Sequence, residues 1–187
     1  MSSSENTSIE SERLELLALG VDFLTASLNG DRAAAERLLG ATIHSEWFDH
    51  AWLLELRLKQ LHADPDLDIW LLKAIVERSS RTMVGHIGFH TAPGPDYLRE
   101  IAPAGVEMGY TIYTPFRRQG YAGESCAALM RWAYEQHGVT TFVVSISPTN
   151  LPSQRIAQRF GFAIVTTVED EEDGVEEVYV LTYPPQP

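Results

Sequence analysis

The sequence is poor in cysteine, in basic residues and in long apolar runs. Cys126 is the only cysteine among 187 residues, which excludes an internal disulfide and a cysteine-cluster metal site and suits a reducing cytoplasm. Lysine and arginine number 14 against 26 acidic residues, and this net charge of -12 disfavours binding to nucleic acid or to an anionic membrane. No run is long enough to span a membrane, and the N-terminus does not follow the plan of a signal peptide. We therefore expect a cytoplasmic protein with no nucleic-acid or membrane partner.

The composition is otherwise that of a globular protein. Hydrophobic residues make up 44% of the chain and charged residues 21%, enough apolar material for an ordinary core. No linker-like stretch divides the sequence, so we expect one domain over residues 1–187, with flexible tails at 1–8 and 184–187.

The hydrophobic pattern alternates between helical and strand periodicity, which predicts an α+β (mixed α/β) fold. Asp31 is placed to cap one helix and Ser45 another, and Asp64-Pro65 ends the second of these. A hairpin turn is expected at Asp173-Gly174. The predicted helices are two short ones within residues 21–39, then 45–61, 120–136 and 151–160. The predicted strands are 13–19, 69–76, 83–90, 105–113, 141–146, 162–168 and 175–182.

The most informative segment, residues 110–125, reads YTIYTPFRRQGYAGES and passes from a strand through a basic turn into a helix. Backbone N–H groups at such a turn are unpaired, and the helix dipole adds positive charge, so the turn can hold an anion. Arg117 and Arg118 add charge suited to two phosphates, and Gly120 lets a ligand approach the backbone closely. The alternative is an ordinary turn whose arginines are only solvated.

These residues resemble a known family. Arg117-x-x-Gly120-x-Ala122, between a strand and an amphipathic helix, is similar to the pyrophosphate-binding motif of the GNAT superfamily of acyl-CoA N-acyltransferases. The flanking motifs resemble the branch that contains ribosomal-protein N-terminal acetyltransferases. They are Glu107-Met-Gly-Tyr110, Gly123-Glu124, Asn150-x-x-Ser153 and Phe160-Gly-Phe162. The resemblance covers residues 67–183, and Glu12-Arg13-Leu14 is similar to the opening strand of that branch.

The resemblance implies a central, mostly antiparallel sheet of about seven strands flanked by helices. The fourth and fifth strands, here 105–113 and 141–146, would splay apart and admit the pantetheine arm of acetyl-CoA. Gly109 in mid-strand fits a bulge at this opening. The residues implied in binding acetyl-CoA are Met108, Gly109, Tyr110, Thr111, Arg117, Arg118, Gln119, Gly120, Tyr121, Ala122, Gly123 and Asn150.

Acetyl transfer to an amine needs a base for the amine and an acid for the departing thiolate. Glu107 is the candidate base, because a carboxylate in an apolar strand should have a raised pKa; it can act directly or through water, or be purely structural. The tyrosine that many family members use as the acid is replaced by Ala157. Ser153 matches the serine of the ribosomal-protein branch, although it and Asn150 can simply start a helix.

We therefore expect an acetyltransferase that uses acetyl-CoA, without a metal, to modify a primary amine by direct transfer in a ternary complex. The acceptor would be a protein N-terminus or a small molecule. The alternatives are another acyl donor, or a non-catalytic acyl-CoA-binding module.

Several features outside these motifs bear on the acceptor. Residues 169–177 contain seven carboxylates, which can attract an ammonium group or form a solvated turn. His86 or His90 can face the acceptor. Trp47, Phe48 and Trp52 are expected in the core or in the wall of the acceptor pocket. Cys126 lies on the apolar stripe of its helix, which favours a packed structural thiol.

Overall fold

The computed structural model describes residues 8–170 and 174–184. The predicted flexible tails fall mainly outside this part, as does the turn residue Asp173. The chain forms two compact units, one of residues 1–88 and 110–129 and the other of residues 89–109 and 130–187. A single domain over residues 1–187 remains a prediction.

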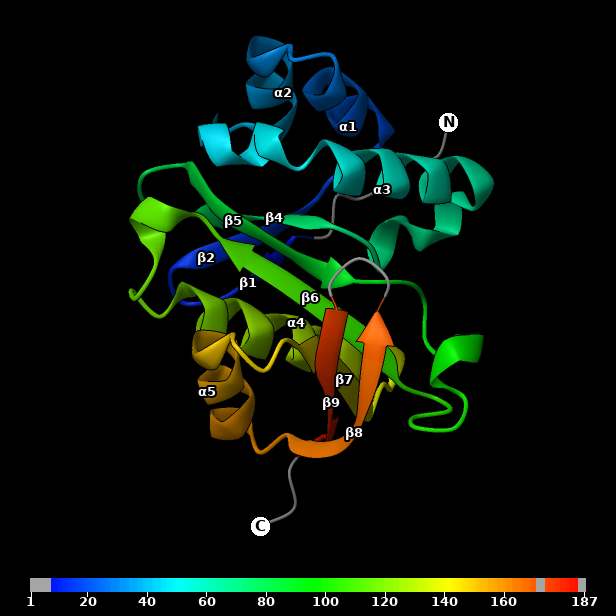
Figure 1. Cartoon of the computed structure of the whole chain (residues 1–187). Helices are drawn as coiled ribbons and strands as arrows, with labels where there is room; N and C mark the ends of the chain where they lie inside the picture. The colour runs from blue at the N-terminus through cyan, green and yellow to red at the C-terminus, as the bar shows by residue number, and fades with distance from the viewer. Residues whose placement is uncertain (1–7, 171–173, 185–187) are drawn as a thin grey trace. The chain divides into compact units, whose positions relative to one another are not determined.

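The first unit places three helices against one face of a mostly antiparallel sheet (Figure 1). β2 pairs with β1 and β4, β4 pairs with β5, and β3 lies parallel to β5. The strands are β1 (Ile9–Glu10), β2 (Leu14–Ala18), β3 (Thr42–Ile43), β4 (Lys73–Glu77) and β5 (Thr82–Phe89). The helices are α1 (Val21–Leu28), α2 (Arg32–Leu39) and α3 (Ala51–Ala63). β6 (Val106–Ile112) ends in this unit, and α4 (Tyr121–His137) begins in it.

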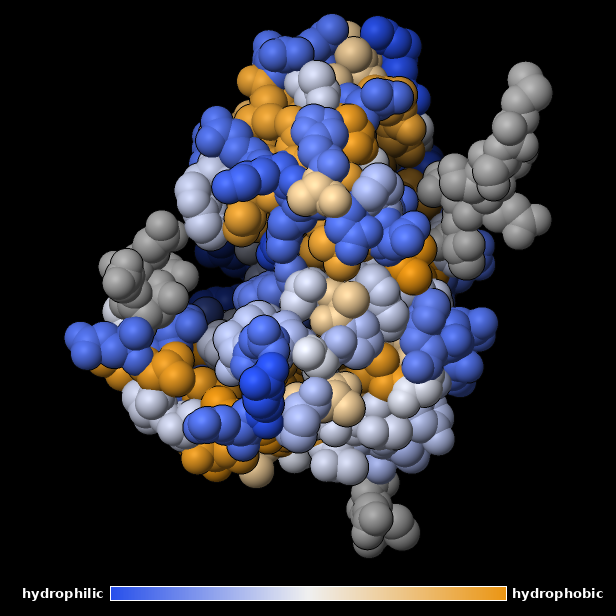
Figure 2. All heavy atoms as spheres, turned by 90° about the vertical axis from the view of Figure 1, so that its right-hand side faces the viewer, coloured by the Kyte–Doolittle hydropathy of each residue, from blue (hydrophilic) through white to orange (hydrophobic). Residues whose placement is uncertain are grey.

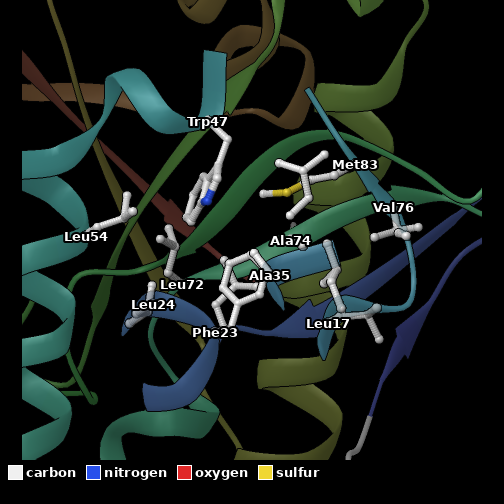
Figure 3. Close-up of a cluster of buried hydrophobic side chains, with 14 of the residues drawn as sticks. Leu17, Phe23, Leu24, Ala35, Trp47, Leu54, Leu72, Ala74, Val76 and Met83 are labelled. Atoms are coloured by element: carbon white, nitrogen blue, oxygen red, sulfur yellow. The ribbon is translucent and has the colours of Figure 1, made fainter. Parts of the chain in front are cut away.

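The core of the first unit forms where these helices meet the sheet (Figure 3). Trp47 is fully buried and packs on Phe23, with ring centroids 5.6 Å apart, and its indole N–H donates to Ser27 Oγ at 2.9 Å. Its burial confirms the core placement, whereas Trp52 is 60% exposed and does not belong to the core. Trp52 lies in the first turn of α3, on the side away from the buried Leu54 and Leu61. The cluster contains Leu17, Phe23, Leu24, Ala35, Trp47, Leu54, Leu72, Ala74, Val76 and Met83 among others.

Local signals predicted most element ends and missed two. Asp31 caps α2 as expected, with its carboxylate accepting from the N–H of Ala34 at 2.9 Å. The predicted helix 45–61 is wrong at its start, because Ser45–Asp49 is a 3-10 helix capped by His44, whose Nδ1 accepts from the N–H of Glu46. The predicted strand 69–76 also starts too early. Pro65–Ile69 forms another 3-10 turn, since Asp64 accepts from the N–H of Asp66.

The second unit contains a sheet made by the start of β6 together with β7 (Thr141–Ile146), β9 (Gly174–Thr182) and β8 (Ala163–Asp170). β6 and β7 are parallel, and their register covers Val106 and Glu107 at the beginning of β6, consistent with the expected splay. The other pairs are antiparallel. α5 (Leu151–Phe160) packs near β7, and the 3-10 turn Asp96–Leu98 contributes Leu98 to a small core.

The described chain is thus mixed α/β with a large, mostly antiparallel sheet, as the sequence predicted, but with nine strands rather than about seven. The two additional strands, β1 and β3, are each two residues long, too short to show a periodic pattern.

Side-chain exposure follows the expected partition between surface and core. Hydrophilic side chains cover most of one face of the molecule, with apolar side chains in small patches among them (Figure 2). Cys126 is buried, and burial raises the pKa of its thiol, which confirms a packed structural cysteine. None of the helices in the described part is long and apolar enough to cross a membrane.

A buried histidine in the first unit makes stability depend on pH. His86 is 4% exposed, and its Nδ1 lies 3.4 Å from the hydroxyl of Tyr113. Burial, with smaller contributions from His50 and Arg57, lowers the pKa of His86 from 6.5 to about 3. Between these two values the unfolded chain binds a proton that the folded chain does not, so acidification favours unfolding.

We predict that His86→Gln weakens this acid sensitivity. The free energy of unfolding, measured by urea titration from pH 7 down to pH 4, should fall less steeply than in the wild type, by up to about 1.4 kcal/mol per pH unit. His62→Gln, which changes an exposed histidine at the end of α3, should leave the wild-type slope unchanged. Equal slopes for His86→Gln and the wild type would contradict the assignment.

Candidate active site

The basic turn before α4 has an unusual backbone. Thr114–Phe116 forms a 3-10 turn, Arg117 is extended, and Arg118 and Gly120 both adopt left-handed conformations, with φ of 61° and 85°. α4 begins at the next residue, Tyr121. The first N–H groups of a helix have no acceptor within the helix, and alternating backbone conformations of this kind form anion-binding concavities. The local geometry therefore suits the predicted anion cradle.

The two arginines of the turn differ in their surroundings. The Nε of Arg117 donates to the carbonyl of Ile112 at 2.9 Å, which ties the turn to the end of β6. Both arginine side chains are exposed. Arg117 thus has a structural contact in addition to its charge. Arg118 is itself one of the two left-handed residues of the turn.

Glu124, in the first turn of α4, holds the N-terminal strand region against the helix start. Its Oε1 accepts from the backbone N–H of Arg13 and from Ser11 Oγ, both at 2.7 Å, and its Oε2 accepts from Arg13 Nε at 2.8 Å. Burial raises the pKa of Glu124, but the hydrogen bonds from Arg13 and Ser11 and the charge of Arg13 together lower it by more. The net pKa is therefore below its usual range. The carboxylate is therefore ionised near neutral pH.

The same arginine lies close to the glycine of the turn. The Arg13 guanidinium lies 4.6 Å from the centre of the Tyr121 ring, and its Nη2 would be 3.3 Å from a Cβ added to Gly120. Sequence reasoning placed Arg13 and Glu124 in separate motifs and did not pair them, because 111 positions separate them in the chain.

In the second unit, Glu107 is a buried carboxylate with several donors. Its Oε1 accepts from Ser145 Oγ at 2.6 Å, and its Oε2 lies 3.4 Å from His90 Nδ1. Burial raises the pKa of Glu107, but the hydrogen bonds from His90, Ser145 and Tyr97 and the charge interaction with His90 outweigh it. The net pKa is lowered, so the raised pKa expected from the sequence is wrong. The apolar neighbours of Glu107 in the chain did not reveal these donors, which come from the loop after β5, from a 3-10 turn and from β7.

Asn150 and Ser153 form the start of α5. The Asn150 side-chain oxygen accepts from the N–H of Ser153 at 3.3 Å, which is the N-cap role weighed from the sequence. The Ser153 side chain is half-buried, and Ala157 lies buried farther along the helix. The capping contact uses the backbone of Ser153, so its hydroxyl is not needed for the cap.

The predicted site residues divide between the two units. The first unit contains Tyr110, Thr111, Arg117, Arg118, Gln119, Gly120, Tyr121, Ala122 and Gly123. The second contains Glu107, Met108, Gly109, Asn150 and Ser153. Within the second unit, the structure adds His90, Tyr97 and Ser145 around Glu107. Of these, only His90 was a candidate from the sequence; Tyr97 and Ser145 carry no motif.

A model of the acetyltransferase (GNAT) domain matches residues 21–163 of this chain. The chain belongs to the GNAT acetyltransferase family. A Bacillus subtilis (strain 168) N-acetyltransferase named YjdG, itself uncharacterised, is 26% identical over 162 residues, which cover 83% of this chain and 89% of the relative. The protein is therefore an acyltransferase enzyme of the GNAT type.

Solved structures share the GNAT fold. A GNAT-family acetyltransferase from Bordetella pertussis aligns with a TM-score of 0.68 and 21% identity, over 94% of this chain and 99% of that one. RimL, a ribosomal L7/L12 alpha-N-protein acetyltransferase solved with coenzyme A, aligns with a TM-score of 0.61 and 18% identity, over 94% and 98% of the two chains. These neighbours confirm the fold that the sequence motifs implied.

The two glycines that flank the start of α4 should respond oppositely to alanine. Gly120→Ala forces a side chain onto a residue with φ of 85° and should destabilise the protein by about 1 kcal/mol or more. Gly123 lies within α4, and an added Cβ would meet nothing within 4 Å. Gly123→Ala should therefore stabilise the protein by about 0.5 kcal/mol or more.

Urea unfolding of the wild type and both variants measures this difference. A neutral or stabilising Gly120→Ala would show that the turn does not require the left-handed backbone at this position.

Proposed function

We propose that this GNAT enzyme transfers the acetyl group of acetyl-CoA to a primary amine, by direct attack within a ternary complex. The observation that carries the proposal is the turn from Arg117 to Gly120, where two left-handed residues lead into the start of α4. A helix start preceded by exposed arginines suits a pyrophosphate, because backbone N–H groups and positive charge act on the same anion.

Each group of predicted binding residues has a proposed role. N–H groups of residues 118–123 would hold the pyrophosphate, and backbone groups of residues 108–111 would pair with the pantetheine arm, together with Asn150. The exposure of β6 supports this assignment, since the strand is buried from Val106 to Met108 and half-buried from Gly109 onward. A strand that loses cover in its middle leaves backbone groups that a ligand can approach.

The chemical step needs a path for two protons. Bond formation between the acceptor nitrogen and the thioester carbon releases a proton from nitrogen, and Glu107 belongs to the path that removes it. Cleavage of the carbon–sulfur bond leaves a thiolate, and Ser153 is the proposed proton donor to it. The half-buried Ser153 hydroxyl is compatible with this role, because the helix cap uses the Ser153 N–H instead.

The acceptor is proposed to be a cationic amine, on a peptide N-terminus or a small molecule. The acidic stretch 169–177 and the net charge of -12 favour the approach of such a group. Within this stretch, Glu177 accepts from the hydroxyl of Tyr179 at 2.7 Å and lies 3.4 Å from Gln154 Nε2 of α5. RimL, which has a related fold, is named as an alpha-N-protein acetyltransferase. This supports a peptide N-terminus as the acceptor.

A cytoplasmic location is part of the proposal. The single cysteine is buried and forms no disulfide, which is compatible with a reducing compartment.

Arg118→Gly and Ser153→Ala test the two halves of this proposal. Glycine tolerates the left-handed backbone of residue 118, so Arg118→Gly removes the charge without straining the turn. It should raise the KM for acetyl-CoA roughly 10-fold with little change in kcat. Ser153→Ala should lower kcat on the order of 10- to 100-fold with the KM for acetyl-CoA nearly unchanged.

Thiol release from acetyl-CoA, measured over a panel of amines and peptides, provides the readout. Arg159→Ala, which removes another exposed arginine from the last turn of α5, serves as the control and should match the wild type. Tight binding of coenzyme A without thiol release from any amine would favour a non-catalytic acyl-CoA-binding module. Release from a longer acyl thioester in preference to acetyl-CoA would favour another donor.

A further inference from the structure

The Glu107 carboxylate is enclosed by protein groups. Its side chain is 10% exposed, Oε1 accepts from Ser145 Oγ at 2.6 Å, and Oε2 faces His90 Nδ1 at 3.4 Å. The Tyr97 hydroxyl also donates to the carboxylate. A substrate amine that approaches this site therefore meets the groups around the carboxylate before it meets the carboxylate itself.

His90 lies between Glu107 and the solvent. Its backbone N–H donates to the carbonyl of Glu107 at 2.9 Å, which sets His90, the first residue after β5, beside Glu107 of β6. The His90 side chain is 42% exposed, against 10% for that of Glu107. The imidazole is accordingly the member of the pair that an acceptor can reach.

The surroundings of the His90 ring differ at its two nitrogens. Nδ1 faces Glu107 Oε2, and Nε2 lies 3.0 Å from the position that a Cβ on Gly109 would occupy. Residues 107 and 109 face the same side of β6, since side chains alternate along a strand. The ring therefore extends along one face of β6, from the carboxylate to the point where the strand becomes half-buried. A side chain at residue 109 would press on Nε2, which gives a local reason for glycine there.

We propose that His90 is the general base of the acetyl transfer and that Glu107 is the residue that positions it. The inference rests on the proposed function and extends it by naming the base. A carboxylate that accepts from Nδ1–H holds the imidazole in the tautomer whose Nε2 carries the lone pair, and it stabilises the imidazolium that forms. An imidazole is also better matched to proton transfer near neutral pH than an ionised carboxylate with a lowered pKa.

The proposed transfer passes the amine proton to His90 and a separate proton to the departing thiolate. The acceptor ammonium first loses one proton to solvent. The neutral amine nitrogen then forms a bond with the thioester carbon while one of its remaining protons passes to His90 Nε2. The carbon–sulfur bond breaks, and the coenzyme A thiolate takes a proton either directly from solvent or from Ser153, whose hydroxyl is then restored by a proton from solvent. The imidazolium, beside the Glu107 carboxylate, then returns its proton to solvent. The products are the N-acetylated amine and coenzyme A.

A purely structural reading of the same contacts is that His90 only neutralises a buried carboxylate. The two readings differ in what they predict for kcat. In the structural reading, removal of the imidazole lowers stability and affects kinetics only through unfolding. In the proposed role, kcat falls in protein that remains folded, and an added base can replace the missing ring.

The decisive experiment measures acetyl-CoA turnover by wild type, His90→Gln, His90→Ala, Glu107→Gln and the control His62→Gln, on the best amine of the panel. His90→Gln should lose on the order of 100-fold or more in kcat, with the KM for acetyl-CoA changed by less than about 2-fold. Glu107→Gln should lose roughly 10-fold. Added imidazole should restore part of the activity of His90→Ala, and His62→Gln should equal the wild type.

Two further measurements keep the test independent of folding and of turnover. Thermal unfolding shows whether each variant is folded at the assay temperature. The nitrogen-15 chemical shifts of the neutral His90 ring report its tautomer, and the proposal requires the proton on Nδ1 in the wild type. Protonation mainly on Nε2 would overturn the proposal.

The outcomes separate this inference from the proposed function. If the wild type acetylates an amine and folded His90→Gln retains its kcat, His90 is not the base, although the enzyme is still an N-acetyltransferase. Failure of imidazole to rescue folded His90→Ala also counts against the base role. If the wild type releases no thiol with any amine, the proposed function fails, and the role of His90 fails with it.

Discussion

A carboxylate inside an apolar strand is stable in its ionised form only when hydrogen-bond donors surround it. Glu107 meets this condition with donors from three other segments: His90 after β5, Tyr97 in a 3-10 turn and Ser145 on β7. The loop after β5 also contributes Leu98 and Ala102 to the small core of the second unit, where they pack with Val143 of β7 and Val178 of β9. A single charged residue thus contacts the loop after β5, a 3-10 turn and β7.

A second carboxylate has the corresponding role at the helix start. Glu124 accepts from the backbone and side chain of Arg13 and from Ser11, and this network joins the beginning of the chain to α4. Because Arg13 also lies over Tyr121, the same N-terminal segment contacts two residues in the first turn of α4. The turn from Arg117 to Gly120 thus leads into a helix start that is already ordered, as preorganised binding of an anion requires.

The sequence predicted elements well where periodicity was strong. α5 and β7 have the predicted bounds, because each is framed by local signals such as the Asn150 cap and the left-handed Gly161. The start of α3 and the strand before β5 were less accurate. There, His44 and Asp64 side chains accept from nearby N–H groups and stabilise 3-10 turns in segments with apolar content, a competition that hydrophobic spacing does not represent.

The sequence by itself determined the family, through motifs whose residues are close together in the chain. It also located the basic turn and marked Glu107 as a candidate site residue. Only the tertiary structure decided how those residues behave. The pKa of Glu107 is lowered rather than raised because donors from distant segments outweigh burial, and the exposed imidazole of His90 lies beside it. The pairing of Arg13 with Glu124 was equally hidden. Each depends on the distance and direction between groups far apart in sequence, which composition and local spacing do not specify.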